Sequence, residues 1–197
     1  MSETVFRILA ALVFSAAIGI SITFRHKADR DSGEKVSWKD EGLAMVLALR
    51  LGGLVMWFSM IAYLVNPAWL AWSRFGLADW VRWFGLGLGL SCVALIYWLF
   101  SSLGSGITPT VATRKRHRLV THGPYRWVRH PLYTVGTAFV LSFALMADSW
   151  FIAAMAILAF ALLALRVPNE EAHLVAEFGD EYRDYVKKTG RFLPRLG

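Results

Sequence analysis

Long apolar runs constrain this chain more than any other feature of its sequence. Five are present, at residues 5–24, 43–65, 80–103, 132–146 and 150–165. Each of the first three reaches the roughly 20 residues that an α-helix needs to cross the hydrocarbon core of a bilayer. The last two runs are shorter and are separated by the polar pair Asp148-Ser149, so they indicate a tight helical hairpin. The sequence leaves open whether this hairpin crosses the membrane fully. The pattern predicts an all-α integral membrane protein with about five transmembrane helices.

The composition supports lipid as the solvent of these helices. Hydrophobic residues make up 56% of the 197 residues, whereas a soluble domain of this length rarely exceeds half apolar. The formal net charge of +7 would favour a nucleic-acid partner in a soluble protein. Here the basic residues flank the apolar runs, so membrane orientation explains them better and we expect no nucleic-acid partner. The one cysteine, Cys92, lies within an apolar run and is expected to pack rather than to react.

Lysines and arginines concentrate in three stretches that follow the first, third and fifth apolar runs. They lie in residues 25–39, 114–129 and 166–195, whereas the stretch between the second and third runs carries only Arg74. Because five crossings alternate sides, the three basic stretches share one face, which the positive-inside rule places in the cytoplasm. We therefore predict a multi-pass protein of the inner or cell membrane with its N-terminus outside. Four tryptophans fit an aromatic belt at the outer interface, namely Trp69, Trp72, Trp80 and Trp83.

The chain divides into a chemically quiet half and a half rich in polar residues. Residues 1–103 hold the first three predicted spanning helices, in which Arg50 and Arg82 are expected to extend towards lipid headgroups. The Gly-x-Gly-x-Gly sequence that begins at Gly85 lies inside an apolar run and predicts close helix packing, not a dinucleotide loop. Residues 104–197 hold a polar segment, the helical hairpin and a polar tail, and we expect them to form one structural unit with the first half.

The segment from Arg114 to Tyr133 reads RKRHRLVTHGPYRWVRHPLY and is too constrained for a plain connecting loop. A basic surface loop would account for its charges but not for the Gly123-Pro124 and His130-Pro131 turns. Pro131 suits the first turn of the fourth helix, where a missing N–H costs no hydrogen bond. The three histidines are spaced by five and eight residues, match no standard zinc pattern and have no cysteine partner, so we predict no metal site.

A second polar group follows the fifth apolar run, at Arg166, Pro168, Glu170 and Glu171. Arg166 and Glu170 are four residues apart and would share one helix face if Pro168 only kinks the chain. The alternative is an ordinary interfacial ion pair, with the carboxylates capping a following helix. Beyond this group, helical spacing of apolar residues predicts an amphipathic cytoplasmic helix that ends near Gly190 and packs over the site as a lid. Its apolar positions are Leu174, Val175, Phe178, Tyr182, Tyr185 and Val186.

Taken in order, these motifs resemble the signature of the isoprenylcysteine carboxyl methyltransferase family in its short prokaryotic form. The motifs are Gly123-Pro124-Tyr125, Arg129-His130-Pro131-Leu132-Tyr133 with Gly136, Glu170-Glu171, Phe178-Gly179, Glu181-Tyr182, Tyr185, Arg191 and Pro194. The similarity covers about half the chain. Related phospholipid and small-thiol methyltransferases share the RHP-x-Y-x-G turn and the paired glutamates. Sterol reductases, which use a nicotinamide cofactor, resemble this region more distantly.

The resemblance implies several spanning helices and an S-adenosylmethionine cofactor bound in the C-terminal region on the cytoplasmic face. In the family, the segment that leads into the RHP turn wraps the cofactor, and the first glutamate of the pair contacts it. The positions that match are His117, Arg118, Leu119, Val120, Tyr125, His130, Pro131, Leu132, Tyr133 and Glu170. Arg166, one helical turn before Glu170, matches the arginine that faces the acceptor carboxylate. Arg166 and Glu170 are therefore the candidate catalytic residues, with Arg166 as the substrate-binding residue.

Methyl transfer from a sulfonium to a carboxylate suits these residue types. A carboxylate is already ionised near neutral pH, so no strong general base is required and catalysis rests mainly on alignment in a water-poor pocket. An arginine can orient a carboxylate through two parallel hydrogen bonds. We therefore predict a methyltransferase acting on a membrane lipid or a prenylated small molecule or peptide, with the carboxylate of a prenylcysteine-like substrate favoured. A phospholipid, a small thiol, a sterol-type NADPH reductase reaction and a non-enzymatic scaffold stay open as alternatives.

Overall fold

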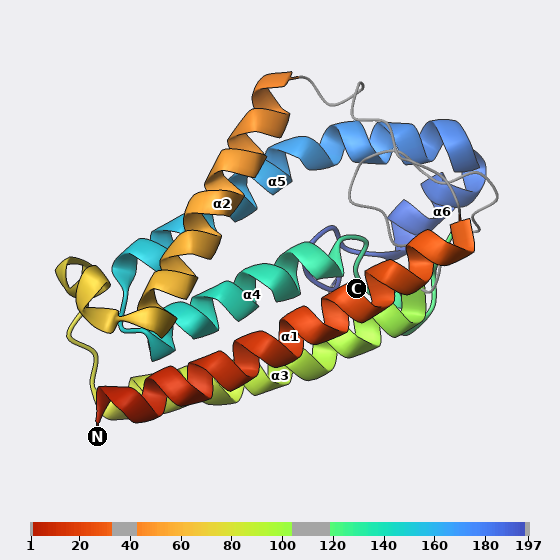
Figure 1. Ribbon diagram of the computed structural model, residues 1–197. Coiled ribbons are helices and arrows are strands. Elements are labelled where there is room, and N and C mark those ends of the chain that lie inside the picture. Colours follow the sequence, from red (N-terminus) through yellow and green to blue (C-terminus); the bar gives the residue numbers. More distant parts are fainter. Residues whose placement is uncertain (1, 33–42, 104–118, 196–197) are drawn as a thin grey trace.

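The computed structural model describes residues 2–32, 43–103 and 119–195. Six α-helices and two short 3-10 helices make up this part of the chain (Figure 1). The α-helices are α1 (Glu3–Ser32), α2 (Leu43–Val65), α3 (Asp79–Leu103), α4 (Pro131–Met146), α5 (Trp150–Phe178) and α6 (Asp180–Lys188), and the 3-10 helices are η1 (Pro67–Ser73) and η3 (Gly123–Arg126). No β-strand occurs in these ranges. The predicted all-α class is confirmed.

Four of the helices are long and apolar enough to cross a membrane. They are Glu3–Lys27 within α1, Ala44–Val65 within α2, and the whole of α3 and α5. The remaining apolar helix, α4, has 16 residues. The fifth apolar run, residues 150–165, is the first part of a longer helix, since α5 has 29 residues in all and includes Pro168. A proline inside a helix removes one main-chain donor, but α5 continues through Pro168. The multi-pass membrane architecture is confirmed.

Close packing of α3 against α4 forms the centre of the molecule. Figure 1 shows α1 running beside α3 and α2 crossing α5. Gly85 allows α3 to approach α4, since a Cβ at this position would lie 2.8 Å from the Leu145 Cβ and 3.0 Å from the Ser142 carbonyl oxygen. A Cβ at Gly89 would lie 3.0 Å from the Ser142 hydroxyl, whereas open space surrounds Gly87. The prediction of close helix packing is confirmed for the two outer glycines and is wrong for the middle one.

Arg82, near the beginning of α3, is buried with 6% of its surface exposed. Its guanidinium donates to the two Glu3 carboxylate oxygens at 3.0 and 2.9 Å and to the Met146 carbonyl at the end of α4 at 2.6 Å. The Tyr63 hydroxyl donates to the same carboxylate at 2.8 Å. The prediction that Arg82 extends to the headgroups is therefore wrong, because Glu3 and a free helix-end carbonyl supply the partners that a buried guanidinium needs. These four residues are named the Glu3 cluster.

The topology brings the described parts of the predicted basic stretches together at one end of the molecule, here named the basic end. α1 and α3 finish there and α4 begins there (Figure 1). The guanidinium of Arg25, late in α1, lies 5.8 Å from the centre of the Phe100 ring, late in α3. At the opposite end, the turn between α4 and α5 is tight, and the Ser149 hydroxyl accepts from the Ile152 N–H as the helix cap. The predicted helical hairpin is confirmed.

Candidate active site

The turn between η3 and α4 forms the first part of the site. Gly123 opens η3 with φ of +59°, a conformation that favours glycine, and a Cβ there would collide with Ser102 on α3. Pro131 occupies the first turn of α4, as the sequence predicts. These constraints fix the path of the turn against the end of α3. They hold His130 with only 7% of its surface exposed.

A segment near the C-terminus lies along this turn. Residues 189–192, named the C-terminal strap, run parallel to residues 127–130. The N–H groups of Arg129 and His130 donate to strap carbonyls at 2.9 and 3.0 Å, and the Gly190 N–H donates back to the turn at 3.0 Å. The strap is therefore part of the site although it lies far from the turn in the sequence.

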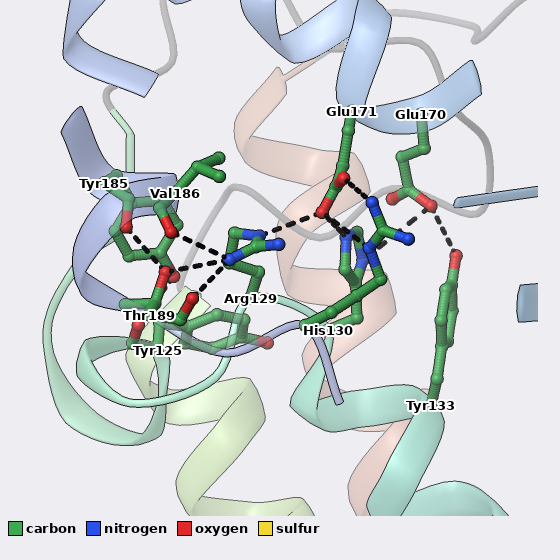
Figure 2. A network of polar contacts seen from close by, with 10 residues as sticks. Tyr125, Arg129, His130, Tyr133, Glu170, Glu171, Tyr185, Val186 and Thr189 are labelled. Carbon is green, nitrogen blue, oxygen red and sulfur yellow. Dashed lines mark hydrogen bonds and ion pairs between the residues drawn. The ribbon is translucent and has the colours of Figure 1, made fainter. Parts of the chain in front are cut away.

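Glu171 on α5 joins the turn to the strap (Figure 2). Its Oε1 accepts from Arg129 Nε at 2.9 Å and lies 3.4 Å from His130 Nε2, while its Oε2 accepts from Arg191 at 2.6 Å. The side chains of Arg129 and Glu171 expose only 8% and 13% of their surface. Arg129 also donates to the Thr189 carbonyl in the strap. Arg129, His130, Glu171 and Arg191 are named the Glu171 cluster.

Glu170 has different neighbours from the adjacent Glu171. The Tyr133 hydroxyl donates to Glu170 Oε2 at 2.8 Å, and His130 Nδ1 lies 4.0 Å from the same oxygen (Figure 2). The rings of His130 and Tyr133 stack with centres 5.5 Å apart and planes 14° apart. Because successive residues of a helix point about 100° apart, the two carboxylates lie on different faces of α5. Arginines enclose Glu171, whereas Glu170 meets a hydroxyl and an imidazole.

The structure brings three of the predicted cofactor residues into contact, namely His130, Tyr133 and Glu170. Tyr125 is buried beneath the turn, where burial raises the pKa of its hydroxyl, and its carbonyl accepts from the Tyr185 hydroxyl at 2.6 Å. Within the described ranges, no group of three or more His, Cys, Asp or Glu side chains is arranged to hold a metal ion. The Glu170 carboxylate and the rings of His130 and Tyr133 thus form a small group, here named the polar centre.

The other predicted residues lie around this centre. Arg166 is half-buried one turn before Glu170 on the continuous α5, as the four-residue spacing predicts. Leu119 and Val120 are half-buried at the beginning of the segment that leads into η3. His117 and Arg118 lie outside the described residues. The cofactor and acceptor roles of all these residues stay predictions.

Three residues at the centre of the site were assigned no role from the sequence: Arg129, Glu171 and Arg191. All three belong to the motifs that carry the family resemblance. A signal for them was available, since two adjacent carboxylates at the membrane end of a helix need more than one cationic partner. The spacing of residues along the chain did not reveal which arginines are the cationic partners of these carboxylates.

The predicted amphipathic helix is two helices. α5 continues to Phe178, Gly179 takes φ of +57°, and α6 begins at Asp180. The prediction of one helix across this region is wrong, because glycine permits the left-handed conformation that ends α5. The predicted end near Gly190 is confirmed, since α6 finishes at Lys188. α6 buries Tyr185 against the turn, and this burial raises the pKa of the Tyr185 hydroxyl to about 12.

An apolar cavity of about 570 Å³ lies between α1, α2, α3 and α4. Its lining is apolar except for Ser21 and Arg25. Leu132 and Gly136, in the first turns of α4, form the part of the wall closest in sequence to Tyr133. Leu132, predicted as a cofactor residue, therefore borders the cavity, which extends from the basic end along the apolar lengths of α1 and α2.

Comparison with protein families decides the class of the chain. The family model described as phospholipid methyltransferase matches residues 80–181, which are 102 of the 197 residues. The chain belongs to the phospholipid methyltransferase family. The matched range contains η3, α4, α5 and all of α3 except its first residue, and so includes the RHP turn and both glutamates of the site.

Individual relatives connect the chain to two groups of proteins. The nickel-cobalt-cadmium resistance protein NccN of Alcaligenes xylosoxydans xylosoxydans is 40% identical over 86 residues, which cover 44% of this chain and 40% of that protein. Protein-S-isoprenylcysteine O-methyltransferase B of Arabidopsis thaliana is 27% identical over 162 residues, which cover 77% of this chain and 78% of that protein. The resemblance to isoprenylcysteine methyltransferases is confirmed.

A solved structure shows the same fold. The eukaryotic intramembrane Ras methyltransferase ICMT (isoprenylcysteine carboxyl methyltransferase) matches 95% of this chain and 68% of its own chain, with a TM-score of 0.60 and 20% sequence identity. At this identity the likeness establishes the fold.

Proposed function

We propose that this chain is an S-adenosylmethionine-dependent membrane methyltransferase whose acceptor carries an apolar tail. The acceptor group we favour is the carboxylate of a prenylcysteine-like molecule. One observation carries the proposal: Leu132, which lies between His130 and Tyr133 of the polar centre in the sequence, lines an apolar cavity. The family of the chain and its isoprenylcysteine methyltransferase relatives support methyl transfer as the reaction.

The polar centre fits S-adenosylmethionine by the chemistry of its groups. A carboxylate beside aromatic rings suits a ligand that carries positive charge together with hydroxyl and amino donors. Glu170 accepts hydrogen bonds from the bound cofactor, and Tyr133 holds that carboxylate in position through its 2.8 Å bond. His117, Arg118, Leu119 and Val120 complete the binding segment in this proposal. When bound, the cofactor supplies an electrophilic methyl group.

Arg166 orients the acceptor in this proposal. It lies one turn before Glu170 on the same helix, next to the apolar part of α5, where a lipid-borne anion would arrive from the side. A guanidinium can hold a carboxylate through two parallel charge-assisted hydrogen bonds. Because the acceptor is already ionised, the residues of the site need only align the reacting groups and exclude water.

The cavity supports an acceptor with a lipid tail over a small water-soluble one. Its volume of about 570 Å³ lies within the range of roughly 300–1,000 Å³ typical of small-molecule sites. A tail that enters it leaves water for an apolar wall, which is favourable. With the tail between α1, α2 and α4, the polar head lies at the basic end beside the site. The positive-inside rule places this end in the cytoplasm.

A phospholipid headgroup amine is the second candidate acceptor, because the matching family model is that of phospholipid methyltransferases. An ammonium group must lose a proton before it can accept a methyl group, whereas a carboxylate need not. Methylation of an amine therefore rises with pH as the ammonium titrates, and carboxyl methylation stays level over the same range.

A methyl-transfer assay with labelled cofactor tests the proposal on the protein in detergent. Prenylcysteines, fatty acids, phospholipids and thiols serve as parallel acceptors. We expect a base-labile methyl ester on the prenylcysteine and inhibition by S-adenosylhomocysteine. Failure to methylate any acceptor, in a folded sample that also binds no S-adenosylhomocysteine, would refute the proposal. Thermal protection by NADPH without protection by the sulfonium cofactor would favour a reductase instead.

A further inference from the structure

Glu171 contacts three residues from two separate parts of the chain. Arg129 and His130 belong to the turn before α4, and Arg191 belongs to the C-terminal strap. The carboxylate thereby joins α5, the turn and the strap at one point. Glu170, the preceding residue, faces Tyr133 and the Nδ1 side of the His130 imidazole.

We propose that Glu171 is a positioning residue that docks the C-terminal strap on the turn and thereby fixes His130 and Tyr133 for cofactor binding. The inference rests on the proposed function, since the ligand that the polar centre would meet is the cofactor. Glu171 itself acts through its partners, because its two carboxylate oxygens are already occupied by Arg129 and Arg191.

The burial of the ion pair makes this role physically reasonable. The Arg129 and Glu171 side chains are 8% and 13% exposed, whereas Arg191 is 44% exposed. Charge-assisted hydrogen bonds are roughly twice as strong as neutral ones, and a buried charge that loses its partner is strongly destabilising. Removal of the Glu171 charge therefore leaves Arg129 without its carboxylate, and this is the residue that also donates to the Thr189 carbonyl in the strap.

The main-chain pairing between turn and strap gives a direct readout of docking. The N–H groups of Arg129, His130 and Gly190 make the three hydrogen bonds that join the two segments. Their hydrogen exchange in the ligand-free protein reports how often the strap detaches. This measurement does not depend on any cofactor or acceptor.

The experiment compares Glu171→Gln with Glu177→Gln, which changes an exposed carboxylate on the same helix. For each variant we measure hydrogen exchange at the three amides, the Kd for S-adenosylhomocysteine by calorimetry, and kcat at saturating cofactor. Arg191→Gln is the second variant, because Arg191 is partly exposed and its loss leaves the core intact. The double variant Glu171→Gln/Arg191→Gln tests whether the two residues act as one unit.

For Glu171→Gln we expect exchange at the three amides to accelerate and the Kd to rise by about tenfold or more, the scale of a lost charge-assisted bond. The kcat at saturating cofactor should fall by less than about threefold, because an effect on binding is removed by saturation. Arg191→Gln should change the same quantities less, the double variant should be no worse than Glu171→Gln alone, and Glu177→Gln should match the wild type.

Three results would overturn the inference: unchanged exchange in Glu171→Gln, faster exchange with an unchanged Kd, or single-variant effects that multiply in the double variant. A different result separates this inference from the proposed function. If the folded wild type binds no S-adenosylhomocysteine but the three amides still respond to Glu171→Gln, the proposed function fails and the docking of the strap by Glu171 stands.

Discussion

The molecule carries a carboxylate–arginine cluster at each end, and the two differ in what they leave accessible. In the Glu3 cluster, Arg82 donates to Glu3 and to the Met146 carbonyl, and the Tyr63 hydroxyl also donates to the carboxylate. In the Glu171 cluster, arginines also enclose one carboxylate, but a second carboxylate, Glu170, stands beside it. The first arrangement is closed on itself, whereas the second carries a neighbour that can meet a ligand.

The two clusters make the same kind of carboxylate–arginine contact but join different kinds of elements. The Glu3 cluster ties the beginnings of α1 and α3 to the end of α4, elements that already pack along their length. The Glu171 cluster ties α5 to a turn and a strap, which are segments outside the α-helices. We therefore expect damage to the first cluster to appear as lost stability and damage to the second as lost ligand binding.

Arg82→Met tests the stability half of the comparison and should give the largest effect. The variant keeps an apolar stem but leaves Glu3 and the Met146 carbonyl without the guanidinium, and breaking a buried pair costs about 3–5 kcal/mol. Thermal unfolding in detergent should show a large decrease in midpoint. Cofactor affinity per folded molecule should stay within about threefold of the wild type.

Arg74→Ala is the matched control, because Arg74 also approaches Glu3, at 3.6 Å, but its side chain is 49% exposed. Exposed pairs contribute about 0–1 kcal/mol, so this variant should unfold close to the wild-type midpoint. Equal destabilisation by Arg74→Ala and Arg82→Met, or lost cofactor binding in folded Arg82→Met, would break the comparison.

Arg166→Ala tests the ligand-binding half of the comparison, because it distinguishes positioning of the acceptor from binding of the cofactor. If Arg166 orients the acceptor, cofactor affinity should stay within about threefold while turnover falls by about 100-fold, the scale of lost positioning. Calorimetry and the methyl-transfer assay measure the two quantities. Arg183→Ala is the control, since Arg183 pairs with Asp180 on the exposed surface of α6, and its turnover should be unchanged.

Tyr133→Phe tests the support of Glu170 and should give a smaller effect. The variant keeps the ring that stacks on His130 but removes the hydroxyl that donates to Glu170 at 2.8 Å. A hydrogen bond to a charged group contributes about 1.5–3 kcal/mol, so we expect the Kd for S-adenosylhomocysteine to rise by about tenfold. An unchanged Kd would show that Glu170 needs no support from this hydroxyl.

The apolar helices could be predicted from the sequence because their signal is local. The second and third apolar runs match α2 and α3 closely, since length and hydropathy decide whether a segment spans a membrane. The end of α5 was missed because the helical spacing of apolar residues continues across Gly179, so the spacing alone did not show where α5 stops and α6 begins. The proline is accommodated inside the helix, and the glycine ends it.

The site was predictable in part for the same reason. The RHP turn, Tyr133 and Glu170 form short motifs whose resemblance to a family is visible without a structure. Glu171 was not distinguished from Glu170, because only the packing of α5 decides which neighbour each carboxylate faces. Arg82 was misread as a headgroup contact because its partner, Glu3, lies 79 residues away in the sequence.

Calorimetric titration with S-adenosylhomocysteine is the most direct test of whether Glu170 belongs to the cofactor site. The wild type should bind with a Kd of roughly micromolar or tighter. Glu170→Ala should weaken binding by about tenfold or more, because it removes a carboxylate that accepts hydrogen bonds from the ligand, whereas Glu177→Ala on the exposed face should bind as the wild type does. Wild-type binding that Glu170→Ala leaves intact, or that only Arg166→Ala abolishes, would contradict the account.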